Sequence, residues 1–359
     1  MTGRPRSAVD GLPAYRPGKG AAQAEAEHGI ADAIKLASNE NPWGPVPSVV
    51  AAIEAAAGEV NRYADHRATA LRERLADRLA VDPTSVTVGC GSVGLLQQLF
   101  LTYVDPGDEV VFPWRSFEVY PVYAALTGGI AVMPPLAGDR FDLGAVADAV
   151  TERTKLVLLA TPNNPTGTSV STDDVGDLVA HIDNRTLVVI DEAYREFNAP
   201  SFGDPVVDLV PRFDNVMVLR TFSKAHGLAG LRVGYGVASP TVVESVDKTL
   251  FPFAVNGVAQ AAAVAAIDAD QEIRARVAAL LAERDRVVAA LRAAGHVFPD
   301  PQANLVWLRL GDRTDGVYLA LERRGVGTRP FSGEGLRVTI GTPAENDRFV
   351  DALAAVTAD

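Results

Sequence analysis

The chain of 359 residues has very little cysteine and histidine, with one cysteine, Cys90, and five scattered histidines. A single cysteine excludes an internal disulfide and is typical of a reducing cytoplasm, where we expect this protein. The histidines and the lone thiol show none of the spacings of a zinc site, so we expect no bound metal. No apolar run reaches the roughly 18 residues of a membrane span. The residues after Arg4 and Arg6 also lack the apolar core of a secretory signal.

Positive charge is scarce as well. Lysine and arginine number 33 against 45 aspartates and glutamates, which gives a net charge of −12. Such an acidic chain is a poor surface for nucleic acids or anionic membranes, so we expect neither as a partner. Hydrophobic residues make up 48% and charged residues 22%, as in a globular protein with a large core. An anionic ligand must therefore meet local groups of positive charge.

Short apolar runs alternate with helical patterns along most of the chain. Helices are predicted over residues 46–60, 68–80 and 91–101. Buried strands are predicted at 86–88, 109–112, 156–159, 187–190, 216–219 and 233–236. This alternation is typical of an α/β fold in which helices cover both faces of a mostly parallel sheet.

The pattern also predicts how the chain divides. Residues 1–30 form an arm rich in Pro, Gly and Ala that we expect to have little structure of its own. Residues 31–265 are predicted to form a large ligand-binding domain, and residues 266–359 a smaller domain that packs with the arm. A long amphipathic helix over 271–294, stopped by Gly295, leads into the second domain. There we expect three strands and a final helix, at 304–310, 326–328, 336–340 and from Pro343.

The most informative residue is Lys224, which follows the strand predicted at 216–219. Thr221 and Ser223 precede it, and Arg232 lies a short loop away. An amine, two hydroxyls and a guanidinium at the carboxyl end of a strand suit a ligand that carries a phosphate and an aldehyde. Pyridoxal phosphate carries both, and its aldehyde forms a Schiff base with a lysine. Considered alone, however, a lysine at a strand end is usually a solvated residue.

Gly91, Ser92 and Val93 belong to a glycine-rich loop, GCGSVG, that follows the strand predicted at 86–88. The loop opens a predicted helix, whose first N–H groups would hold a phosphate together with the Ser92 hydroxyl. An ordinary glycine turn explains this loop equally well when it is considered alone.

Two further clusters follow the next strands of the predicted sheet. Asn164 stands between prolines in TPNNPTG, where its amide can donate a hydrogen bond at a fixed angle. Asp191 and Tyr194 follow the strand at 187–190. As a carboxylate, Asp191 would keep a pyridine nitrogen protonated, while Asn164 and Tyr194 would hydrogen-bond the ring oxygen. A turn and a helix cap are the ordinary alternatives. The four clusters occur in order along the chain, each directly after its own predicted strand. Each cluster suits a different part of one cofactor, and this agreement favours a cofactor site.

Together these residues resemble the fold-type I pyridoxal-phosphate aminotransferases, and within them the histidinol-phosphate aminotransferase branch. The resemblance runs almost end to end, through KLASNENP at 35–42, NRY at 61–63, and residues 163–167, 191–194, 221–232 and 336–341. It implies a large domain with a seven-stranded, mostly parallel sheet, a smaller α+β domain, and pyridoxal 5'-phosphate as the cofactor.

The same resemblance implies roles for residues outside the four clusters. Tyr63 would reach the cofactor phosphate bound by the neighbouring subunit, which implies a homodimer. Arg337 would grip the acid group of the substrate. Arg329 would line the substrate site and contact the phosphate of histidinol phosphate, and Asn39 is expected to contribute to substrate binding.

Two segments depart from the commoner histidinol-phosphate pattern. Val93 and Gly94 follow Ser92 where that pattern has Asp and Glu, and WRSFEVY at 114–120 replaces a shorter Thr-Tyr/Phe-centred motif. Both forms, GCGSV and WRSFE, resemble the actinobacterial aromatic amino acid aminotransferase subgroup. Phe117 would then stack on the cofactor ring, with core packing as the alternative. We therefore expect transamination between an aromatic L-amino acid and a 2-oxo acid such as 2-oxoglutarate, through a Lys224 Schiff base.

Other functions stay open at this point. Histidinol phosphate is the closest rival substrate, because the Arg329 guanidinium suits a phosphate as well as a carboxylate. The residues that hold the ring would equally serve decarboxylation of an amino-acid phosphate. A non-enzymatic sensor or regulator would need a DNA-binding segment, for which the arm is too short and the chain too acidic.

Overall fold

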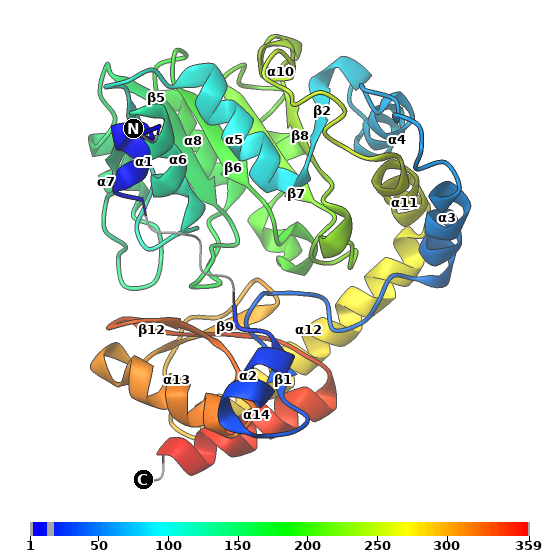
Figure 1. Ribbon diagram of the computed structural model, residues 1–359. Coiled ribbons are helices and arrows are strands. Elements are labelled where there is room, and N and C mark those ends of the chain that lie inside the picture. The colour runs from blue at the N-terminus through cyan, green and yellow to red at the C-terminus, as the bar shows by residue number, and fades with distance from the viewer. Residues whose placement is uncertain (1–2, 13–17, 358–359) are drawn as a thin grey trace.

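The computed structural model describes residues 3–12 and 18–357, and its largest element is a seven-stranded sheet (Figure 1). In spatial order its strands are β2 (Val86–Gly89), β8 (Gly234–Ala238), β7 (Val216–Thr221), β6 (Leu187–Asp191), β5 (Thr154–Ala160), β3 (Glu109–Val111) and β4 (Ile130–Val132). The five strands β7, β6, β5, β3 and β4 run parallel to one another, and β8 runs antiparallel to both of its neighbours, β2 and β7. The predicted α/β fold with a mostly parallel sheet of seven strands is confirmed.

Helices cover both faces of this sheet because successive side chains of a strand point to opposite sides. In β5, Leu156 and Leu158 pack in one cluster with helices α5 (Gly91–Tyr103), α6 (Val119–Thr127) and α10 (Pro240–Asp247). Val157 and Leu159 pack in another, with α4 (Thr69–Leu79), α7 (Leu143–Asp148) and α8 (Thr172–His181). Burial on both faces explains why these strands are continuous apolar runs in the sequence.

A second, antiparallel sheet lies below the large one in Figure 1. Its strands are β11 (Arg329–Phe331), β12 (Gly335–Thr339) and β9 (Leu305–Arg309). Helix α13 (Thr314–Arg323) follows β9 in the chain, and α14 (Pro343–Thr357) follows β12. The long helix α12 (Asp270–Ala293) runs from α11 (Gly257–Asp268) to the neighbourhood of α14. The division of the chain into domains at about residue 265 stays a prediction.

The N-terminal arm has more structure than predicted. Helices α1 (Ser7–Asp10) and α2 (Ala21–His28) form within it, and β1 (Ile34–Lys35) then pairs in parallel with β10 (Val326–Gly327). Lys19 and His28 lie 2.7 and 3.0 Å from the buried carboxylate of Glu322 on α13. The prediction of an arm with little structure was therefore wrong for α2, because this anchoring carboxylate is almost 300 positions away in the sequence. Residues 1–2 and 13–17 of the arm lie outside the described residues.

The other predicted elements are present, with ends that differ by a few residues. The sequence analysis missed β1, β4 and β11, which are two or three residues long and partly exposed. The remaining elements are α3 (Pro47–Ala57), α9 (Pro205–Asp208) and 3-10 turns at Pro83–Ser85, Arg195–Phe197, Pro200–Phe202, Ala229–Leu231 and Gly311–Arg313.

Residues 3–12 and 18–357 contain neither a candidate membrane span nor a candidate metal-binding group. None of the helices there combines the length and the apolar character needed to cross a membrane. Within the same residues, no group of three or more His, Cys, Asp and Glu side chains is arranged to hold a metal ion.

Candidate active site

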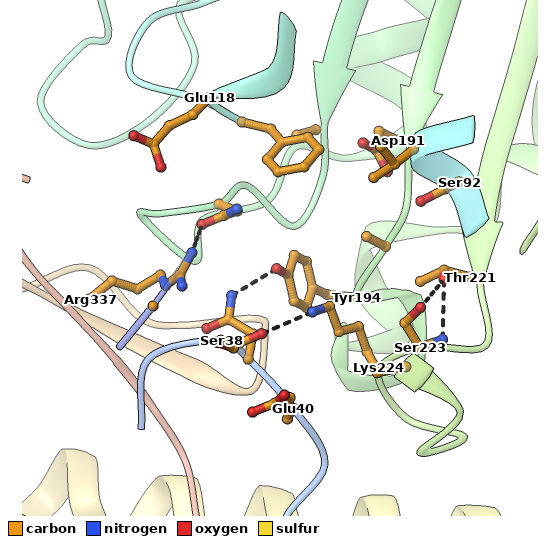
Figure 2. Close-up of a pocket in the computed structure, with 18 of the residues that line it drawn as sticks. Ser38, Glu40, Ser92, Glu118, Asp191, Tyr194, Thr221, Ser223, Lys224 and Arg337 are labelled. Atoms are coloured by element: carbon orange, nitrogen blue, oxygen red, sulfur yellow. Dashed lines mark hydrogen bonds between the residues drawn. The ribbon is translucent and has the colours of Figure 1, made fainter. Parts of the chain in front are cut away.

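A cavity of about 250 Å³ lies at the carboxyl ends of β5, β6 and β7, between the large sheet and the small one (Figure 2). One water takes about 30 Å³ of liquid, so the cavity has room for a small organic molecule. Most of the predicted site residues line it: Asn39, Ser92, Val93, Phe117, Asn164, Asp191, Tyr194, Thr221, Ser223, Lys224, Arg232, Arg329 and Arg337. The fold thus brings together side chains from the N-terminal segment, the large sheet and the small sheet.

Lys224 lies on the loop that follows β7, and its Nζ donates a hydrogen bond to the carbonyl oxygen of Ser38 at 3.1 Å. Burial away from water lowers the pKa of Lys224 to about 8, and the positive charge of Arg337 acts in the same direction. The Nζ also lies 5.9 Å from the centre of the Tyr194 ring. A lysine that loses its proton this close to neutral pH can act as a nucleophile or as a proton acceptor.

Asp191 ends β6 and has one carboxylate oxygen without a good donor. Its Oδ2 accepts a hydrogen bond from the Tyr120 hydroxyl on α6 at 2.9 Å. Its Oδ1 is buried and has no hydrogen bond of ordinary geometry from the described residues, although the backbone N–H of Ala193 is near enough to lower the pKa of the carboxyl group. Burial raises the pKa of Asp191 to about 6, although the Tyr120 hydrogen bond and the Lys224 charge lower it. Because such an oxygen is costly to bury, its position indicates that a ligand supplies the missing donor.

The sequence analysis did not identify Tyr120 as a site residue. Its side chain is completely buried in the cluster around α5 and α6, and burial beside Asp191 raises its pKa well above the ordinary value. An aromatic residue within an apolar segment is ordinarily a core residue, so no signal in the sequence separated it from its neighbours.

Hydroxyl and guanidinium groups gather at the N-terminus of α5. Thr221 Oγ1 donates to Ser223 Oγ at 3.0 Å, and Arg232 Nη1 lies 3.4 Å from the same Ser223 oxygen. Gly91 has a φ of +71°, a backbone conformation that favours glycine, and the Arg232 guanidinium lies close beside it. Together with Ser92, these groups and the helix N-terminus form a cradle that suits a phosphate.

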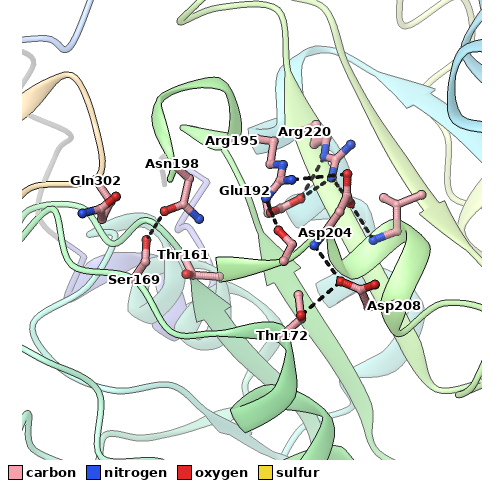
Figure 3. Close-up of polar contacts among 12 residues, drawn as sticks. Thr161, Ser169, Thr172, Glu192, Arg195, Asn198, Asp204, Asp208, Arg220 and Gln302 are labelled. Atoms are coloured by element: carbon pink, nitrogen blue, oxygen red, sulfur yellow. Dashed lines mark hydrogen bonds and ion pairs between the residues drawn. The ribbon is translucent and has the colours of Figure 1, made fainter. Parts of the chain in front are cut away.

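A buried polar network fixes the ends of β6 and β7 behind the cavity (Figure 3). Arg220, which directly precedes Thr221, lies 2.7 Å from Glu192 and 2.6 Å from Asp204. Glu192 directly follows Asp191, and burial raises its pKa although the Arg220 charge opposes the shift. Removing one partner of a buried ion pair typically costs about 3–5 kcal/mol. The network therefore holds in register the two strand ends that carry Asp191 and Thr221.

The two neighbouring asparagines of the TPNNPTG turn have different surroundings. Asn163 is completely buried and shapes the turn, since its Nδ2 donates to Thr166 and its Oδ1 accepts from Ser116 at 2.8 Å. Asn164 instead lines the cavity, and its Oδ1 accepts a hydrogen bond from Arg337 Nη1 at 2.6 Å. The structure thus places the asparagine that the sequence analysis chose, Asn164, at the cavity.

Asn39 supports Tyr194 from the opposite wall of the cavity. Its Nδ2 donates to the Tyr194 hydroxyl at 2.8 Å, and its Oδ1 accepts from the Thr339 hydroxyl on β12 at 3.0 Å. Asn39 was predicted to bind substrate, and that role stays a prediction. In the structure it lies between Tyr194 and the small sheet, so it sets the position of the tyrosine hydroxyl.

Two ion pairs join the segment before α6 to the small sheet. Arg329 Nη2 lies 2.9 Å from Glu118 Oε2, and Arg115 Nε lies 3.0 Å from Glu334 Oε2. Glu118 lines the cavity, as does its neighbour Phe117, whose ring meets that of Tyr120 edge-on at 5.7 Å between centres. The sequence analysis named Phe117 and Arg329 but not Glu118. The contact between Glu118 and Arg329 joins residues 211 positions apart, which no local pattern indicates.

Tyr63, a predicted site residue, lies away from the cavity. Its side chain is 84% exposed and stacks on the Phe253 ring at 4.4 Å between centres. Both residues line a separate surface hollow, together with Val60 and Phe251. The predicted contact of Tyr63 with a cofactor requires a second subunit and stays a prediction.

Comparison with known proteins shows which family this chain is similar to. Residues 31–353 match the family described as "Aminotransferase class I and II". An aromatic amino acid aminotransferase from Thermobifida fusca is 49% identical over 345 residues, which cover 96% of this chain and 95% of that protein. One from Streptomyces avermitilis is 47% identical over 347 residues, with the same coverage. Among solved structures, the histidinol-phosphate aminotransferase of Sinorhizobium meliloti in complex with pyridoxal-5'-phosphate has a TM-score of 0.91 at 30% identity. That match covers 100% of this chain and 98% of the other.

Proposed function

The chain belongs to the aminotransferase class I and II family, and on this premise we propose that it transfers the amino group of an aromatic L-amino acid to a 2-oxo acid such as 2-oxoglutarate. The relatives at 47–49% identity support an aromatic donor, because both are named for it. The observation that carries the proposal is the cavity itself, where a lysine with a pKa of about 8 faces a buried carboxylate and an arginine.

The residues of the cavity fit pyridoxal phosphate as the cofactor. Asp191 Oδ1, which lacks a good donor, suits a protonated ring nitrogen, and the cradle beside Ser92 and Arg232 suits the phosphate. Asn164 and Tyr194 would hold the ring oxygen, and Phe117 would cover one face of the ring. When bound, pyridoxal phosphate supplies an aldehyde that condenses with amines and a ring that withdraws electrons from the substrate carbon.

The chain itself supplies the groups that position the substrate and move the proton. Burial lowers the pKa of Lys224 to about 8, so its Nζ can accept the proton that leaves the substrate Cα, and it would then donate that proton to the carbon that carried the cofactor aldehyde. The Arg337 guanidinium would bind the α-carboxylate through two parallel hydrogen bonds. Asn164 contacts the same guanidinium and would keep its planar fork directed into the cavity.

We also propose that the active unit is a homodimer in the cytoplasm. Tyr63, Phe251 and Phe253 are large apolar side chains exposed around one surface hollow, and such patches mark interaction surfaces. A second subunit seated there would bring Tyr63 toward the cofactor phosphate of its partner. The single cysteine supports a reducing compartment. A molar mass equal to one chain in solution would contradict the dimer.

A panel of amino donors tests the function. Phenylalanine, tyrosine, tryptophan and histidinol phosphate are each supplied with 2-oxoglutarate, while oxo acid formation and the cofactor absorbance are followed. We expect kcat/KM to be at least about tenfold higher for an aromatic amino acid than for histidinol phosphate. The reverse order would assign the enzyme to histidinol phosphate. Release of carbon dioxide without an oxo acid would indicate decarboxylation, and no turnover at all would favour a binding protein.

A further inference from the structure

The cavity contains two guanidinium groups and one carboxylate on the side where the substrate's acid group would bind. Figure 2 shows Glu118 and Arg337 on that side of the cavity. Arg329, on β11, lies against Glu118 at 2.9 Å, with 16% of the arginine and 38% of the glutamate side chain exposed. Arg337, on β12, contacts the uncharged oxygens of Asn164 and Ala37. Glu118 therefore places a negative charge directly against the Arg329 guanidinium on this side of the cavity.

We propose that Glu118 is a specificity-determining residue, which pairs with Arg329 and so favours donors with a carboxylate over donors with a phosphate. The inference rests on the proposed function and deepens it, because it concerns the choice of donor in the same cavity. Glu118 acts on the charge that the cavity presents to the substrate's acid group, and it takes no part in proton transfer.

The charge of the donor's acid group gives the physical reason. An α-carboxylate carries a single negative charge, whereas a phosphate monoester carries about −1.5 to −2 at pH 7. The Glu118 carboxylate, which lines the cavity beside Arg329, would therefore repel a phosphate more strongly than a carboxylate. Like charges in a partly buried site disfavour binding, which is a common way to reject the wrong ligand.

The position of Glu118 in the chain supports this reading. Glu118 belongs to WRSFE, one of two segments in which the chain departs from the commoner histidinol-phosphate pattern. The resemblance implies that Arg329 would contact the phosphate of histidinol phosphate. A carboxylate placed against this guanidinium would weaken such a contact.

The second ion pair provides a matched control. Arg115 and Glu334 join the same segment to the same small sheet, but neither residue is among those that line the cavity. If the Glu118 pair only fastens the segment to the small sheet, loss of the Glu334 charge should have a similar effect. If Glu118 acts by its charge on the bound donor, only its own substitution should change the choice of donor.

The test compares the wild-type holoenzyme with E118Q and E334Q. Reaction of each with phenylalanine and with histidinol phosphate is followed in single-turnover experiments without an oxo acid, so that only the donor half of the reaction is measured. We expect E118Q to raise the efficiency ratio of histidinol phosphate to phenylalanine by about tenfold or more. E334Q should leave that ratio at the wild-type value.

Competition by unreactive anions gives a readout that is independent of turnover. Inorganic phosphate and 3-phenylpropanoate, which has no amino group, are used as competing ligands of the holoenzyme. E118Q should bind inorganic phosphate about tenfold more tightly relative to 3-phenylpropanoate. Glutamine keeps the shape of glutamate and can still accept a hydrogen bond from Arg329, and the thermal midpoint of each variant checks its folding.

The outcomes separate this inference from the proposed function. A wild-type enzyme that prefers histidinol phosphate would refute the proposed function, whatever the variants do. A wild-type enzyme that prefers phenylalanine, with both ratios unmoved in E118Q, would overturn the role of Glu118 alone. Equal changes in E118Q and E334Q would overturn it as well, and would show that the ion pairs act by fastening the segment.

Discussion

The two sides of the cavity are held in different ways. On the side of the large sheet, Asp191 and Thr221 are 4% and 3% exposed, and a buried network anchors both strand ends. On the side of the small sheet, Arg329 and Glu118 form an ion pair that water can reach. Burial makes the large-sheet side stiff, whereas charges near water exchange partners at little cost. We therefore expect changes on the large-sheet side to affect the chemistry of every donor, and changes on the small-sheet side to affect binding and donor choice.

Lys224→Ala gives the largest expected effect. It removes the amine that we propose forms the Schiff base and moves the proton, so kcat should fall about 10⁴-fold for aromatic donors and histidinol phosphate alike. Steady-state kinetics with each donor measure the loss, and the Schiff-base absorbance band should disappear. Activity within tenfold of wild type would show that another group carries the proton.

Arg337→Lys tests the small-sheet side and should have an intermediate effect. Lysine keeps the positive charge but cannot form two parallel hydrogen bonds to a carboxylate. We expect kcat/KM for phenylalanine to fall about 10- to 100-fold, mostly through a higher KM. The comparison between the two sides would fail if kcat alone fell while KM stayed constant.

Tyr120→Phe should have the smallest effect on activity, and the pH dependence of kcat/KM would detect it. The Tyr120 hydroxyl lowers the pKa of Asp191 from what burial alone would give, so its loss should raise that pKa. In the proposed function Asp191 works as a carboxylate, and it would lose this form as the pH falls through its pKa. A higher pKa therefore moves the acid limb of the kcat/KM profile to higher pH, with activity near pH 6 reduced about twofold for half a unit. An acid limb at the wild-type position or lower would contradict a positioning role for Tyr120.

The predictable part of the molecule is the part that depends on short stretches of chain. The strands expected at 156–159, 187–190 and 216–219 are present as β5, β6 and β7, because burial on both faces leaves a continuous apolar run. Asp191 and Lys224 lie at the cavity because the ends of parallel strands share one edge of a sheet. In contrast, β4 is a partly exposed edge strand of three residues, and its pattern is too short to recognise.

Other features depend on contacts that no local pattern contains. Helix α2 was missed because the contacts that anchor it, from Lys19 just before it and His28 at its end, reach Glu322 on α13. Tyr120 was missed because a buried aromatic residue that donates to a carboxylate has the same sequence signature as one that packs in a core. The place of Tyr63 outside the cavity likewise follows from the fold, since NRY in the sequence does not indicate which surface it occupies.

The sequence by itself determined the fold class, the family and the groups that stand at the ends of the strands. These follow from hydrophobic periodicity and from residues a few positions apart, whose relative placement a strand and its turn already set. Only the tertiary structure decided which polar and charged groups meet across the cavity: Lys224 with the carbonyl of Ser38, Asn164 with Arg337, and Glu118 with Arg329. Such pairs join segments more than 170 positions apart, and electrostatic interactions depend on distance in space rather than on distance along the chain.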